Sequence, residues 1–346
     1  MNVTSEWSVR SAGKEDLNKI RSLYKSVWSY NRPEQFDQWR YFSSPDCPIP
    51  AALAEDGDRL AGSYTLWPTE LKIGKSVFLG AQSMDTMTHP DYQGQGVFTK
   101  LAEACYEIAA DRGFKVLYGF PNPLSYPGFV KRLGWTHTGD ITHWIRLIKP
   151  SGHSKIPGPI KPIADLATRL LPRGSKRDFE IVLEKPTEQD IEPLLTHWRS
   201  ESGTCRIERS PEWLSWRYAS EAENDYQWVA AYRNGVLKAA AVWGRQNSAW
   251  GAVADNRAHL VELLGQDPQA LEAVLAAIIN QAQKSGAILL ETVSNIDRIC
   301  RALRWAGFYR HRQAPLIIRG LGETNFDTDI LTHNNWRIMG GDLDTF

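Results

Sequence analysis

The segment that decides the fold of this chain is Thr88-His-Pro-Asp-Tyr-Gln-Gly-Gln-Gly-Val-Phe-Thr-Lys-Leu101. A β-rich run over residues 77–88 leads into it, and apolar residues follow at helical spacing from Leu101 onward. A turn between a strand and a helix leaves the first N–H groups of the helix without intrahelical partners, and the helix dipole adds partial positive charge there. The pattern predicts a site for a phosphate or pyrophosphate, which Gly94 and Gly96 allow to approach the backbone closely.

This loop differs from two other glycine-rich phosphate loops. A Walker A loop needs a Gly-Lys pair, and Lys100 does not follow a glycine. The dinucleotide fingerprint needs a third glycine where Thr99 stands. The better fit is Gln/Arg-x-x-Gly-x-Gly/Ala over residues 93–98, with Phe98 in place of the last small residue. This resembles the acyl-CoA pyrophosphate loop of the GNAT superfamily of N-acetyltransferases, and the alternative is a strand–turn–helix with incidental glycines.

A second motif follows at the distance that this family shows. Residues 114–120 have the composition of a buried strand. The next residues resemble the family's closing motif, Asn-x-x-Ala/Ser…Phe-Tyr-x-x-x-Gly-Phe, at Asn122, Ser125, Phe129, Gly134 and Trp135. Val130 stands where the family has a tyrosine that commonly protonates the leaving thiolate of coenzyme A.

The resemblance implies an α/β fold with two tandem GNAT-like domains, each a mixed central β-sheet flanked by helices. It also implies acetyl-CoA as co-substrate, with no metal. The residues that the resemblance places at the cofactor are Met87, Thr88, Gln93, Gly94, Gln95, Gly96, Val97, Phe98, Asn122, Ser125 and Phe129.

Two residues are candidates for catalysis. In this family a base near the thioester often lies on the strand before the loop, and Asp85 is the only ionisable residue of residues 79–88. A carboxylate inside an apolar strand is unusual, so we expect Asp85 to act as base or amine binder, unless it only fixes a strand or bulge through local hydrogen bonds. Tyr126 lies one helical turn before Val130 and is the candidate acid, although it could equally only pack.

Length and composition agree with a cytoplasmic protein. The 346 residues favour two domains, and 42% hydrophobic residues suffice for packed cores. The formal net charge is zero, which predicts no attraction to nucleic acid or membranes. No apolar run approaches the roughly 20 residues of a membrane span, and the first residues lack the features of a secretion signal. Four scattered cysteines show no metal or disulfide spacing.

The sequence also contains an internal repeat. Gln38-Trp-Arg-Tyr41 matches Ser215-Trp-Arg-Tyr218, and Asn122 matches Asn295. A repeat of this length indicates a duplicated domain. We therefore expect a catalytic domain over residues 1–150, a linker over 151–178, a degenerate copy over 179–320 and a docking tail over 321–346.

The degenerate copy has lost the glycines of the loop. Asp267 and Pro268 stand where the anion site would be, adding negative charge and removing a donor N–H. The tail carries Asp342, Asp344 and the carboxylate of Phe346, which would reach the site if the tail returns to the first domain.

These observations predict an N-acetyltransferase that acts on an amine of a small molecule or amino sugar, as a monomer or homodimer. Two alternatives stay open. The chain could be a non-catalytic acyl-CoA sensor, which the loss of the family tyrosine at Val130 allows, or a Fem-like aminoacyl transferase, which a neutral chain with an intact loop disfavours.

Overall fold

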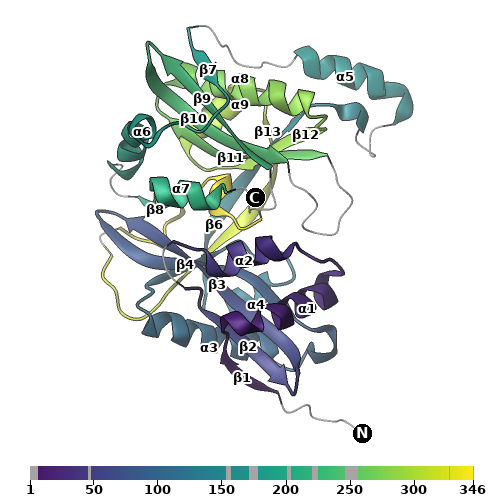
Figure 1. The fold of residues 1–346 in the computed structure, drawn as a ribbon, viewed down its shortest axis with the longest axis vertical. Helices are drawn as coiled ribbons and strands as arrows, with labels where there is room; N and C mark the ends of the chain where they lie inside the picture. The colour runs from purple at the N-terminus through teal and green to yellow at the C-terminus, as the bar shows by residue number, and fades with distance from the viewer. Residues whose placement is uncertain are drawn as a thin grey trace.

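The computed structural model describes residues 7–45, 48–152, 157–170, 178–200, 204–219, 225–245, 256–326 and 328–345. Figure 1 shows two groups of helices and strands, one above the other, with the segment near the C-terminus between them. None of the described helices is long and apolar enough to cross a membrane. The C-terminal Phe346, considered above as a carboxylate donor, lies outside the described residues.

The N-terminal half is a sheet with helices on its faces. Its elements in chain order are β1 (Ser8–Ser11), α1 (Leu17–Trp28), α2 (Glu34–Phe42), β2 (Ala51–Asp56), β3 (Arg59–Ile73), β4 (Ser76–Thr88), α3 (Val97–Asp111), β5 (Val116–Gly119), α4 (Tyr126–Arg132) and β6 (Thr136–Leu147). The predicted strand, turn and helix around the loop are therefore present as β4 and α3, and the mixed α/β class is confirmed.

The C-terminal half repeats this order of elements after the connecting helix α5 (Lys161–Leu170). Its elements are β7 (Glu180–Val182), α6 (Glu188–Ser200), β8 (Cys205–Ile207), α7 (Pro211–Arg217), β9 (Asp225–Arg233), β10 (Val236–Arg245), β11 (Arg257–Gly265), α8 (Pro268–Lys284), β12 (Leu289–Val293), α9 (Asp297–Trp305), β13 (Tyr309–Gly320) and β14 (Trp336–Arg337). Apart from the added β8 and β14, each element of the first half has a counterpart here. The two matching Trp-Arg-Tyr segments end α2 and α7, and their Trp39 and Trp216 rings stack at 5.4 Å.

The two halves share one sheet because they exchange strands. The strand order is β1-β2-β3-β4-β5-β13-β6-β12-β11-β10-β9-β7. The last long strand of the chain, β13, lies between β5 and β6 of the first half, and β6 in turn pairs with β12 of the second. In Figure 1, β6 and the yellow β13 cross the middle of the molecule. The predicted domain limits at residues 150 and 320 stay a prediction from the sequence repeat, and the sheet continues across both halves.

The parallel pair β4 and β5 separates partway along its length. Their pairing ends at Gln82 with Tyr118, although β4 continues to Thr88. In the second half the equivalent pairing of β11 with β12 ends at His259 with Glu291. Backbone N–H and C=O groups beyond such a point need other partners, since an unpaired buried backbone group costs free energy.

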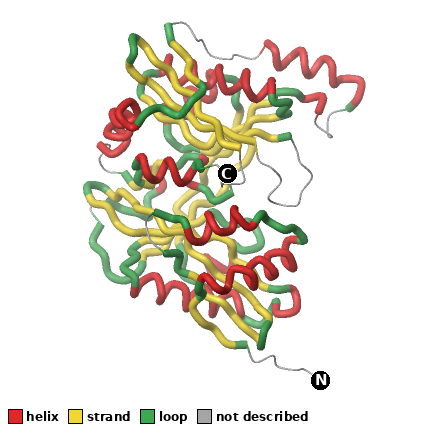
Figure 2. The backbone as a smooth tube through the Cα atoms, in the orientation of Figure 1, coloured by secondary structure: helices red, strands yellow, loops and turns green. Residues whose placement is uncertain are grey.

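The C-terminal tail fills the second of these two gaps. Met339 forms a bridge with Ser294, and the Asn295 side chain donates to the Trp336 carbonyl while accepting from the Ile338 N–H. Trp336, Ile338 and Met339 are fully or almost fully buried. The tail thus supplies hydrogen-bond partners to residues 294–295, just beyond β12. Residues 344–345 then lie at the larger cavity described below, near the centre of the molecule, where Figure 2 shows the end of the chain.

Candidate active site

A cavity of about 1160 Å³ opens at the gap between β4 and β5. Its lining includes residues 83–88 of β4 on one side and residues 119–122, from the end of β5 onward, on the other, together with the loop and the start of α3. The volume lies slightly above the roughly 300–1,000 Å³ of ordinary small-ligand pockets, so the cavity suits a large ligand.

The loop before α3 has the geometry that the sequence predicts. Gly94 and Gly96 have φ values of 78° and 80°, a region that side-chain-bearing residues rarely adopt, and a Cβ atom at either would meet nothing within 4 Å. The N-cap residue of α3 is Gly96, which has no side chain to cap the helix, and no acidic residue lies in the first turn of α3. The first N–H groups of this helix are therefore available to an anion.

The matching loop of the second half is closed by its own chain. The Asp267 carboxylate caps α8 by accepting from the Gln269 and Ala270 N–H groups, and Arg233 pairs with it at 3.2 Å. An anion already occupies this helix N-terminus, which agrees with the expected loss of phosphate binding in the degenerate copy.

Ten of the eleven predicted cofactor residues line the cavity. They are Met87, Thr88, Gln93, Gly94, Gly96, Val97, Phe98, Asn122, Ser125 and Phe129. Gln95 is not among the lining residues, and its side-chain amide donates to the Asp91 carbonyl at 3.1 Å.

Phe98 fits the position of a small residue because a glycine faces it. A Cβ atom at Gly128 would lie 2.8 Å from the Phe98 ring, so only glycine fits there. Phe98 also packs edge-on against Phe129, with ring centroids 5.3 Å apart. The Phe98 ring thus occupies the space beside α4 that a side chain at residue 128 would need.

Tyr126 does not line the cavity. Its hydroxyl lies 2.9 Å from His137 Nδ1, and the two rings pack edge to face. His137 in turn contacts Asp140 on the same strand, β6. The geometry therefore favours the packing alternative for Tyr126 over the role of acid.

Asp85 lines the cavity but is saturated with donors. It lies where β4 bulges against β3, with a φ of 43°. Its carboxylate accepts from Arg32 at 2.8 Å, Arg40 at 3.0 Å and Tyr41 at 2.7 Å. Burial acts to raise the pKa of Asp85, but attraction to Arg32 and Arg40 outweighs burial and holds the pKa well below its usual range. A carboxylate held in this way is a poor base near neutral pH, so the geometry favours the alternative that Asp85 fixes a bulge.

The second half contains the same arrangement 177 positions later. There Arg209 and Tyr218 donate to Glu262 at 3.1 and 2.7 Å, as Arg32 and Tyr41 do to Asp85. Because the cluster recurs in the half where Asp267 already caps the matching helix, it belongs to the architecture of the fold.

Asp344 of the tail reaches the cavity from the far end of the chain. Its two carboxylate oxygens accept from Gln82 and from Arg40, each at 2.7 Å, and its side chain is 12% exposed. Burial, only partly offset by attraction to Arg40, raises the pKa of Asp344. Asp344 therefore has two properties of a general base that Asp85 lacks: its side chain is 12% exposed against 2% for Asp85, and its pKa is raised rather than lowered.

The cavity has a further wall that the sequence analysis missed. We call it the C-terminal wall, and it consists of Arg257 and His259 on β11, Glu291 on β12 and Arg312 on β13. The signal in the sequence that points to part of this wall is the presence of ionisable residues, His259 and Glu291, among the apolar residues of two strands.

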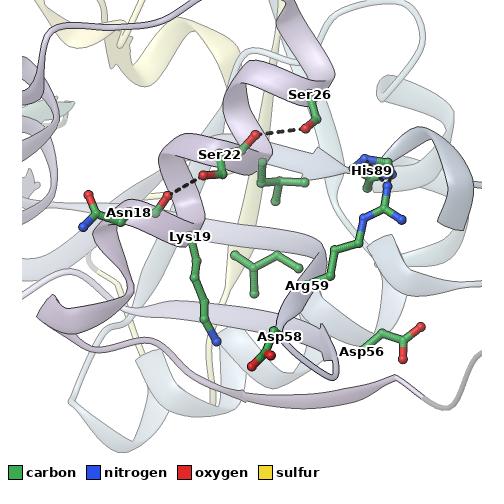
Figure 3. A pocket seen from close by; sticks show the side chains of 10 residues that line it. Asn18, Lys19, Ser22, Ser26, Asp56, Asp58, Arg59 and His89 are labelled. Carbon is green, nitrogen blue, oxygen red and sulfur yellow. Dashed lines mark hydrogen bonds between the residues drawn. The ribbon is translucent and has the colours of Figure 1, made fainter.

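A second cavity, of about 550 Å³, lies between α1 and the turn that joins β2 to β3 (Figure 3). Arg59 extends there toward His89, whose ring lies 2.9 Å from the guanidinium. None of the predicted catalytic or cofactor-binding residues lines this second cavity. Its nearest approach to them in sequence is His89, which follows Thr88 at the end of β4. The larger cavity is therefore the candidate active site.

Comparisons with known proteins agree with this geometry. Residues 8–138 match the family described as acetyltransferase (GNAT) domain. A comparison with curated proteins found no match. A probable N-acyltransferase from Enterococcus faecalis has a TM-score of 0.63 at 13% identity, over 91% of this chain and 73% of that one.

Two further solved structures extend over nearly the whole chain. A GCN5-related N-acetyltransferase from Anabaena variabilis has a TM-score of 0.61 at 10% identity, over 92% of this chain and 73% of that one. A tandem GNAT protein from the clavulanic acid biosynthesis pathway has a TM-score of 0.59 at 12% identity, over 92% of this chain and 100% of that one. At such low identities these likenesses show the fold alone.

Proposed function

We propose that this chain, whose residues 8–138 match the acetyltransferase (GNAT) domain family, transfers an acetyl group from acetyl-CoA to an amine of a small molecule or amino sugar. The observation that carries the proposal is the loop of residues 93–98. It combines two glycines with positive φ, a helix N-terminus whose N-cap is a glycine, and an adjoining cavity of about 1160 Å³.

Acetyl-CoA would supply an acetyl group activated as a thioester, which a neutral amine attacks. The N–H groups at the start of α3 would hold its pyrophosphate, and the unpaired end of β4 lies beside the same cavity. Phe98 and Phe129 line this cavity and would give the bound molecule an apolar surface.

Asp344 takes the proton that the attacking amine must lose. It is the carboxylate of the cavity with a raised pKa, and Gln82 and Arg40 fix its orientation. Asp85 is a positioning residue: it holds the Arg40 guanidinium, which also donates to Asp344 and so orients the Asp344 carboxylate.

A turnover assay separates this function from that of an acyl-CoA sensor. The full chain is mixed with acetyl-CoA, and release of the free thiol is followed with and without a panel of amines. An acetyltransferase should release thiol slowly alone and faster with a suitable amine. A chain that binds acetyl-CoA but releases no thiol under either condition would be a sensor, and the proposed reaction would be wrong.

A further inference from the structure

The C-terminal wall is assembled by the strand exchange. His259 pairs in register with Glu291, and both Val293 of β12 and Arg312 of β13 pair with His143 of β6. The wall therefore spans four adjacent strands, β11, β12, β6 and β13. Side chains that are mounted on strands hold a site more rigidly than side chains on loops.

The charges of this wall do not cancel. The Glu291 carboxylate lies 3.8 Å from the Arg257 guanidinium and 3.5 Å from His259 Nδ1. Burial lowers the pKa of His259, which keeps its imidazole neutral near pH 7. Arg312 is exposed in the cavity, and no ion pair or hydrogen bond links its guanidinium to the described part of the chain. One positive charge thus remains, on Arg312.

The other carboxylates of the cavity cannot supply its partner. Asp85 is held by Arg32 and Arg40, and Asp344 is held by Arg40 and Gln82. Among the described residues of the cavity, no carboxylate remains to pair with Arg312, and a ligand can supply the anion. The loop of residues 93–98 already provides an anion site for the pyrophosphate elsewhere in the cavity, so the ligand at the C-terminal wall is the second substrate.

We propose that the C-terminal wall binds an acidic group of the acceptor, with Arg312 as its principal contact. The acceptor is then an amine that also carries a carboxylate or a phosphate. A planar guanidinium binds either group through two parallel hydrogen bonds, which is why one wall fits both chemistries. The inference rests on the proposed function, since it assigns the acceptor of that reaction.

The test uses the full chain, saturating acetyl-CoA and two pairs of amines. Lysine and cadaverine differ by a carboxylate, and glucosamine 6-phosphate and glucosamine differ by a phosphate. The wild type should show a KM on the order of tenfold lower for the acidic member of at least one pair. The pair that shows this preference distinguishes a carboxylate acceptor from a phosphate acceptor.

Substitutions then locate the preference. Arg312→Gln should raise the KM of the acidic amine by about tenfold and leave that of its neutral counterpart unchanged, while Arg312→Lys should retain part of the preference. Arg301→Gln on α9 removes an exposed arginine outside the cavity and should change neither KM.

Three outcomes would overturn the inference. They are equal KM values within both pairs, an Arg312→Gln variant that affects both members of a pair equally, and no transfer to any of the four amines by a chain that binds acetyl-CoA. A folded chain that does not bind acetyl-CoA would instead contradict the proposed function, and the acceptor assignment would fall with it.

Discussion

Asp344→Asn is expected to lower kcat by roughly 10²–10⁴-fold, the usual contribution of a positioned general base. Asparagine keeps the size of the side chain but cannot accept a proton. The dissociation constant of acetyl-CoA should stay within about twofold, because the loop that binds it is untouched and a general base contributes to the chemical step alone. Rapid-mixing kinetics and calorimetry on the same preparation measure the two quantities.

The pH profile separates a catalytic role of Asp344 from a structural one. Because only the ionised carboxylate accepts a proton, wild-type kcat should fall as the pH drops through the raised pKa of Asp344. This acidic limb of the pH profile, the fall in kcat at low pH, should be absent in Asp344→Asn. Glu323→Gln, at an exposed carboxylate of the preceding segment, is the matched control. A variant that keeps the limb, or a kcat within about threefold of wild type, far short of the loss expected for a general base, would show that another group is the base.

Asp85→Asn is expected to destabilise the fold by about 3–5 kcal/mol at pH 7, since it leaves two buried guanidiniums without their shared carboxylate. Arg32 and Arg40 are 3% and 2% exposed, so water cannot replace the lost partner. Urea unfolding followed by tryptophan fluorescence measures the change in the free energy of unfolding.

The direction of the pH dependence follows from the lowered pKa of Asp85. Its contribution to stability is present above the pKa of an unfolded aspartate, about 3.9, and is lost as the pH falls toward the folded-state value. The difference in the free energy of unfolding between wild type and Asp85→Asn should therefore become smaller as the pH is lowered. Asp111→Asn, at an exposed position that ends α3, should change stability by less than about 0.5 kcal/mol. A similarly small effect of Asp85→Asn would contradict the structural role.

The part of the site proposed to bind acetyl-CoA can be predicted from the sequence because the residues that form it are close together in the chain. A strand, two glycines and a helix within 25 residues specify the loop, and helix dipole and backbone N–H groups supply the binding chemistry without distant partners. The repeat is equally readable, since each copy carries its own strand, turn and helix pattern. Even the compensation between Phe98 and Gly128 lies within the two predicted motifs.

The acceptor half depends on contacts that no local pattern encodes. Arg312 and Asp344 reach the cavity only because β13 is inserted beside β5 and because the tail fills the gap between β11 and β12. Asp85 was a reasonable candidate base as an ionisable residue in an apolar strand. Its role depends on Arg32, which is 53 positions away in sequence and reverses the effect of burial on its pKa.

The measurement that tests the central claim most directly is calorimetric titration of acetyl-CoA into three forms of the chain: wild type, Gly96→Glu and Gly286→Glu. Gly96 and Gly286 have φ values of 80° and 78°, and neither has an atom within 4 Å of an added Cβ, so backbone strain and added charge are matched. We expect micromolar binding by the wild type and Gly286→Glu, and none by Gly96→Glu, whose carboxylate lies at the pyrophosphate loop. Binding that survives Gly96→Glu, or an absence of binding by the wild type, would contradict the assignment of this loop as the acetyl-CoA site.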